Sequence, residues 1–68
     1  MEISQVKEAI ARRWLVEYDG IRYMPVAYRL SLDEQKHRWR HSMELRDLKA
    51  RSITVAPLHL IKIIESED

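Results

Sequence analysis

The spacing of the apolar residues changes at Trp14, and this change limits what the chain can fold into. Before it, Val6, Ile10 and Trp14 recur every four residues, which is the spacing of one face of an amphipathic helix. After it, the period falls to two, which is typical of strands with one buried face. We therefore expect one helix at 4–14, with Ser4 as its N-cap, followed by a chain built mainly of strands.

A tight turn at Asp19-Gly20 joins the first two expected strands. Gly20 is the only glycine in the chain, and an Asp-Gly pair suits a type I′ turn because both central residues need a positive φ. The run that follows, 21–32, contains Pro25, which has no N–H to donate to a neighbouring strand. The sequence therefore predicts a hairpin whose second strand is an edge at Pro25 or carries a β-bulge there.

Intrinsic preference favours a helix over residues 31–50. This stretch contains no β-branched residue, no glycine and no proline, and Ser31 with Glu34 has the spacing of a helical capping box. A helical hairpin is therefore one of two interpretations of this region.

Alternation favours a strand in the same region. Trp39, Met43 and Leu45 alternate with polar neighbours, and burial decides strand formation more than intrinsic preference does. We therefore predict a strand at 37–46, with these three side chains facing inward together, and a polar hairpin loop at 33–36.

The remaining residues predict a short β-rich end to the domain. Residues 53–56 (ITVA) are rich in β-branched side chains, 57–60 suit one turn of 3₁₀ helix, and 61–64 form a closing strand. The acidic residues 65–68 are expected to be a disordered tail. A chain of 68 residues is short enough for one domain, which we place at 1–64.

One helix followed by five short strands, with a 3₁₀ turn before the last strand, resembles the SH3-like small barrels. The stretch VAPLHLI, at 55–61, carries the resemblance, because SH3 domains place a proline and a 3₁₀ turn before an aromatic residue and a valine. Pro57 and Ile61 fit that pattern, and Leu60 stands where the aromatic residue is usual. The resemblance implies a mainly β fold with a five-stranded barrel at 14–64. The same order of elements is also similar to the Sm-like RNA-binding proteins, which assemble into rings by pairing edge strands.

Composition excludes several classes of function. The chain has no cysteine, which excludes disulfides, cysteine-ligated zinc, iron–sulfur clusters and thiol nucleophiles. A single glycine excludes the glycine-rich loops that cradle phosphates. No apolar run approaches the ~18 residues of a membrane span. We expect a soluble, cytoplasmic protein that does not act at a membrane.

Catalytic and metal-binding signals are weak. His37 and His41 stand about 13 Å apart on a strand, which is too far for both to hold one metal ion. No serine lies in a nucleophile motif, and a chain this small leaves little room for a pocket of ~300 Å³ beside its core. We expect no enzyme activity, no metal, no cofactor and no small-molecule substrate.

The arginines are the most informative polar feature. On the predicted strand Arg38, Arg40 and Arg46 point out from one face, and Arg29 lies on the neighbouring strand. Arginine suits carboxylate and phosphate groups alike, and an exposed tyrosine such as Tyr23 adds contact surface. We therefore predict a non-catalytic small binding module whose contact residues are Tyr23, Arg29, Arg38, Arg40 and Arg46.

Two ligand classes fit such a face, beside the alternative of a face that is merely solvated. The first is another protein, including self-association through an edge strand or the helix. The second is RNA or DNA, for which tyrosines offer stacking surfaces. The formal net charge of +1, from 12 Lys+Arg against 11 Asp+Glu, is lower than that of many nucleic-acid-binding domains and favours a protein partner.

Overall fold

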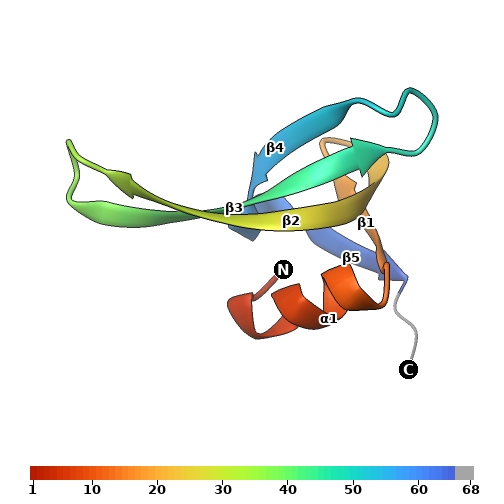
Figure 1. The fold of residues 1–68 in the computed structure, drawn as a ribbon, viewed down its shortest axis with the longest axis horizontal. Coiled ribbons are helices and arrows are strands. Elements are labelled where there is room, and N and C mark those ends of the chain that lie inside the picture. The colour runs from red at the N-terminus through yellow and green to blue at the C-terminus, as the bar shows by residue number, and fades with distance from the viewer. Residues whose placement is uncertain (66–68) are drawn as a thin grey trace.

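The computed structural model describes residues 1–65 and has five antiparallel strands in one sheet, preceded by a single helical segment (Figure 1). In chain order the elements are η1 (Ile3–Gln5), α1 (Val6–Ala11), β1 (Leu15–Tyr18), β2 (Ile21–Asp33), β3 (Arg38–Asp47), β4 (Ile53–Pro57), η2 (Leu58–Leu60) and β5 (Lys62–Glu65). The strand order is β4-β3-β2-β1-β5. The expected mainly β fold with one N-terminal helix is confirmed.

The helix differs from the prediction at both ends. Ser4 lies inside the 3₁₀ turn η1, whose N-cap position is Glu2, so the proposed cap at Ser4 is wrong. The backbone N–H of Glu2 instead donates to the side-chain oxygen of Gln5 at 3.0 Å. At the other end Arg13 has a φ of 55°, a left-handed conformation that ends helices. Trp14 therefore lies outside the helix.

The turn between β1 and β2 has the conformation that its sequence predicts. Asp19 and Gly20 have φ values of 53° and 77°, so both central residues are in the positive-φ region that a type I′ turn needs. The pairing of Tyr18 with Ile21 closes the hairpin directly around this turn.

A bulge in β2 confirms the second of the two roles expected of Pro25. The register with β3 shifts between Pro25 and Ala27, after Pro25 has paired with Leu45. Beyond the shift Tyr28 pairs with Met43. Directly paired residues share a face, so the bulge moves Tyr28 onto the face that Pro25 occupies, although counting along the sequence places the two on opposite faces.

The strand prediction for 37–46 is confirmed by β3, and the helical alternative is wrong. Met43 and Leu45 are 0% exposed, as expected. Trp39 is 61% exposed, so the prediction that it is buried with them is wrong. Its side chain shares their face, but β4 pairs with β3 only at 42–46, and the β2–β3 hairpin extends beyond β4 at that point (Figure 1).

The end of the chain follows the prediction closely. A 3₁₀ turn, η2, begins after Pro57, and β5 pairs with β1. Glu65 is the last residue of β5, so the predicted tail at 65–68 begins within a strand, and its other three residues lie outside the described part of the chain.

The core lies between α1 and the face of the sheet that α1 covers (Figure 1). Its buried apolar side chains are Val6, Ala9, Val16, Tyr23, Met43, Leu45, Ala56, Leu58 and Ile61. Every element except η1 and β5 contributes to this set, with Ile61 coming from the residue between η2 and β5. The domain is therefore held by one small core.

The loop between β3 and β4 is organised by Asp47. Its Oδ1 accepts hydrogen bonds from the backbone N–H groups of Lys49, at 2.7 Å, and Ala50, at 2.9 Å. These bonds, with that from Ala50 the larger cause, lower the pKa of the Asp47 carboxyl below its usual value of 3.8. The ionised carboxylate thus favours the folded loop.

We expect Leu45→Ala to lower the free energy of unfolding by about 3 kcal/mol, because it removes buried side-chain atoms and leaves a cavity in a small core. Chemical denaturation followed by circular dichroism measures the change. Leu48→Ala, in the exposed loop after β3, is the matched control and should shift the free energy by no more than about 0.5 kcal/mol. Equal losses in the two variants would contradict the position of Leu45.

We also expect Asp47 to contribute stability that depends on pH. Its pKa is lower in the folded than in the unfolded state, so its contribution is present above the unfolded value near 3.8. That contribution is lost as the pH falls through the lower folded-state value. Asp47→Asn should flatten the acid side of a plot of unfolding free energy against pH. Glu34→Gln, in the loop between β2 and β3, leaves the hydrogen bonds of Asp47 in place. This variant should keep the wild-type slope of unfolding free energy against pH.

Candidate functional site

The end of the β2–β3 hairpin projects beyond the rest of the sheet (Figure 1). β4 pairs with β3 only at 42–46, so from residue 41 to the hairpin loop the described sheet has two strands. We call residues 29–41 the hairpin arm. The arm has two faces, because side chains alternate along each of its strands.

One face of the arm is apolar. Leu30 pairs with His41 and Leu32 pairs with Trp39, on the same face as the buried Met43. Leu30, Leu32 and Trp39 are 52%, 49% and 61% exposed, and we call these three residues the apolar face. Single exposed apolar side chains are common in proteins, but a cluster of three on one projecting hairpin is not explained by packing within the chain.

The opposite face of the arm carries arginines. Arg29, Arg38 and Arg40 lie on this face, where they pair across the strands with Ser42, Asp33 and Ser31. The Nε atom of Arg40 is 3.5 Å from Oδ2 of Asp33. A surface ion pair of this kind contributes about 0–1 kcal/mol, so it orients Arg40 more than it stabilises the fold.

The fourth predicted arginine lies away from the arm. Arg46 is on the same face of β3 as Arg38 and Arg40, but it pairs with Met24 on one side and with Ile53 on the other. It therefore belongs to the three-stranded part of the sheet. The structure brings three of the four predicted arginines together on the arm and leaves Arg46 apart from them.

Tyr23 cannot be a contact residue in this structure. It is 6% exposed and belongs to the core, paired with Val16 on β1 and Asp47 on β3. The prediction that Tyr23 is exposed is therefore wrong. Along an uninterrupted strand Tyr23 and Arg29, six residues apart, would share a face, but the bulge after Pro25 places them on opposite faces.

Tyr28 and His41 join the two strands at the base of the arm. The Tyr28 hydroxyl is in hydrogen-bond contact with Nδ1 of His41, and the rings stack with centroids 6.0 Å apart. His37 lies in the hairpin loop, with a φ of 52°. Residues 1–65 contain no group of three or more histidine, cysteine or acidic side chains placed to hold a metal ion.

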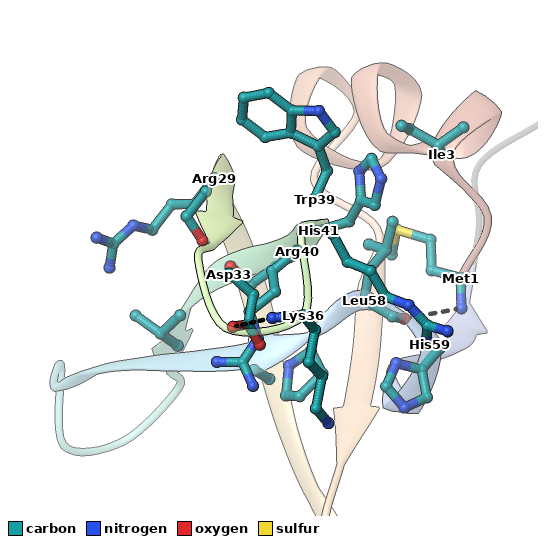
Figure 2. A pocket seen from close by; sticks show the side chains of 16 residues that line it. Met1, Ile3, Arg29, Asp33, Lys36, Trp39, Arg40, His41, Leu58 and His59 are labelled. Atoms are coloured by element: carbon teal, nitrogen blue, oxygen red, sulfur yellow. Dashed lines mark hydrogen bonds and ion pairs between the residues drawn. The ribbon is translucent and has the colours of Figure 1, made fainter.

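An open groove of about 940 Å³ runs along β3 beside the arm (Figure 2). Trp39, His41 and Ile3 lie toward the top of the view, Leu58 lies below His41, and His59 lies farther down. A hollow of this size was not expected from a chain of 68 residues. It is present because it lies outside the core, between the projecting arm and the point where β4 ends.

The apolar face was missed by the sequence reasoning, although a signal was present. Leu30 and Leu32 alternate with polar residues up to the hairpin loop expected at 33–36. Trp39 is the third residue after that loop, where it can pair with Leu32 on the preceding strand. The sequence therefore predicts that the three share a face once the loop is placed. Their exposure was not predicted, because it depends on where β4 ends.

Comparisons with protein-family models, with curated proteins and with solved structures found no match to the chain. No helix within residues 1–65 is long and apolar enough to cross a membrane. The candidate site therefore rests on the geometry of the arm and the groove.

The exposure of Trp39 can be measured directly. Trp14→Phe leaves Trp39 as the only tryptophan, and Trp39→Phe leaves the partly buried Trp14. Acrylamide should quench the fluorescence of the first variant much more strongly than that of the second, because the quencher must touch the ring. Similar quenching in both variants would mean that Trp39 is packed against the domain.

Proposed function

We propose that this protein is a non-catalytic binding module that holds another protein through the hairpin arm. The observation that carries the proposal is the exposure of Leu30, Leu32 and Trp39 on one face of a two-stranded projection. Contiguous exposed apolar side chains mark interaction surfaces, and tryptophan and arginine are enriched among residues that dominate binding energy. The arm presents both residue types within thirteen residues, 29–41.

Burial of the apolar face would supply part of the free energy of a specific contact. Complete burial of a large apolar side chain contributes about 1.5–3 kcal/mol, and these three are already about half buried in the free domain. Covering them would add roughly 2–4 kcal/mol in total. The arginines on the other face add steering and orientation toward acidic groups.

We also propose that the sheet closes as an SH3-like small barrel. The order β4-β3-β2-β1-β5, the bulge in β2 and the 3₁₀ turn before β5 support this assignment. In that order β4 and β5 are the two edge strands. Self-association through these edges is the variant of the proposal in which the partner is a second copy.

Nucleic acid is the second candidate ligand, and one observation favours it. Trp39 is exposed, and such a ring can stack on a base, while Arg38 and Arg40 on the opposite face of the arm can contact phosphates. The ion pair between Arg40 and Asp33 weighs against it, because it lowers the positive charge available at that point.

We expect the double variant Leu32→Ser/Trp39→Ser to lose a protein partner that the wild-type module binds in an extract of its own cells. The reason is that the apolar contact surface is removed while the core is untouched. Affinity capture followed by mass spectrometry, and then a titration with the purified partner, measures the loss. The matched control is Leu48→Ser/Ile53→Ser, which removes two exposed apolar side chains away from the arm and should retain the partner.

The same experiment separates the two ligand classes. Capture that survives nuclease treatment supports a protein partner. Capture that disappears with nuclease, together with an affinity for RNA or DNA that falls steeply with salt, would replace it with the nucleic-acid candidate. Equal capture by the wild type and the arm variant would overturn the proposal.

A further inference from the structure

We propose that the edge of β3 at residues 38–41 binds an extended peptide segment that alternates acidic and apolar residues, by adding it to the sheet in line with β4. This inference rests on the proposed protein-binding function and specifies the form of the partner.

The edge of β3 is open at these four residues. β2 pairs with β3 from Asp33↔Arg38 onward, whereas β4 pairs with β3 only at 42–46. The last β4 pair is Ser42↔Pro57, after which the chain turns into η2. Alternate residues of a strand direct their N–H and C=O groups to the same side. Two of the four residues therefore present backbone donors and acceptors that no described strand uses.

The groove lies where an added strand would run. It is lined by Val55 and Pro57 on β4, so it reaches the last residues of that strand. It is also lined by Trp39 from the apolar face and by Arg38 from the opposite face, which carries the arginines. A hollow that touches both faces of β3 follows the edge of the strand. Its volume of about 940 Å³ is enough for several residues in extended conformation.

The charge around the edge sets the chemistry of the ligand. The basic side chains that line the groove are those of Arg29, Lys36, Arg38 and Arg40, with His41 and His59 beside them, while Asp33 is the acidic side chain of the described lining. Asp33 already faces Arg40. A peptide carrying carboxylates is therefore favoured over a basic or neutral one.

The two sides of the edge require different residues at alternate positions. Side chains of an added strand point alternately to the two faces of the sheet. On one face they would meet Arg38 and Arg40, which favours acidic residues. On the other they would meet Trp39, Ile3 and Leu58, which favours apolar residues. Backbone pairing would supply affinity, and this alternation would supply specificity.

The test uses synthetic peptides as probes. The first is the capped hexapeptide Glu-Val-Glu-Leu-Glu-Val, and the second has the same composition in blocks, Glu-Glu-Glu-Val-Val-Leu. We expect the alternating peptide to shift the backbone amide resonances of residues 38–41 in an NMR titration. It should also slow hydrogen exchange at the two of these residues whose N–H groups face the open edge. The block peptide should bind at least about tenfold more weakly, a difference of about 1.4 kcal/mol.

Backbone methylation tests strand addition directly. Methyl groups are placed on the amide nitrogens of the glutamates in one peptide and of the apolar residues in another. Only one of these sets points toward β3, so one of the two peptides should lose binding by at least about tenfold while the other retains it. Equal behaviour of the two would show that the peptide is held by side chains alone and would overturn the proposal.

A charge exchange tests the role of the arginines. Arg38→Glu/Arg40→Glu should weaken the alternating acidic peptide by at least about tenfold and strengthen its lysine counterpart, Lys-Val-Lys-Leu-Lys-Val. Arg46→Glu is the matched control, because it lies on the same face outside the groove lining and should leave both affinities unchanged. The amide spectra of the variants report whether each one is folded.

The outcomes separate this inference from the function on which it rests. If Leu32→Ser/Trp39→Ser loses the natural partner but no peptide shows dependence on order or methylation, the arm binds a folded surface and strand addition is wrong. If that variant keeps the partner, the proposed function is wrong by its own test. Absence of any shift at residues 38–41 with the alternating peptide overturns the inference in either case.

Discussion

The β-bulge after Pro25 sets the phase of the sheet, and both faces of the hairpin arm depend on it. Before the bulge β2 directs Tyr23 and Pro25 toward the core. After it, the same face is occupied by Tyr28 and then by the leucines of the arm. Since a shift of one residue exchanges the two faces of a strand, a regular β2 could not place both Tyr23 and Tyr28 against the core. The bulge therefore allows one thirteen-residue strand to serve the core at one end and the arm at the other.

The exposed arm is a consequence of how much sheet the remaining elements can cover. α1 has six residues and β4 has five, so α1 and β4 reach only part of the length of the β2–β3 hairpin. Small domains bury a low fraction of their surface, and this one concentrates its burial around Met43 and Leu45. Leu30, Leu32 and Trp39 continue the same apolar face past the limit of that cover.

Local sequence signals predicted the local structure well. The Asp19-Gly20 turn, the alternation that forms β3 and the 3₁₀ turn after Pro57 each depend on a few neighbouring residues, and each is present in the structure. The same reasoning failed for Ser4, because the cap of a short helix depends on where the first turn begins. The first turn of the helical segment is the 3₁₀ turn η1, which starts at Ile3.

The burial of individual side chains depended on pairings between distant segments and was predicted less well. Alternation places Trp39 on the same face of β3 as Met43 and Leu45. It is exposed because β4 pairs with β3 only at 42–46 and does not reach residue 39. Tyr23 was expected to be exposed like Arg29, but it lies before the bulge, on the face of β2 that the core covers. Pro25 indicated that a bulge could occur, but the sequence did not fix the residue at which the phase would change, and the candidate contact surface depended on that residue.

Asp33 links the local structure of the arm to the class of ligand that we propose for it. Its Oδ1 accepts hydrogen bonds from the backbone N–H groups of Gln35 and Lys36, at 3.1 and 3.3 Å, which shapes the hairpin loop. Its Oδ2 faces Arg40 at 3.5 Å. Because the loop already holds this carboxylate in place, it offsets part of the Arg40 charge without being free to move away. The positive charge that remains lies around Arg38 and Arg29, next to an open strand edge whose other face carries the exposed Trp39. For this reason we propose a ligand with a few carboxylates at strand spacing rather than a continuous phosphate backbone, which would require a longer uninterrupted basic surface.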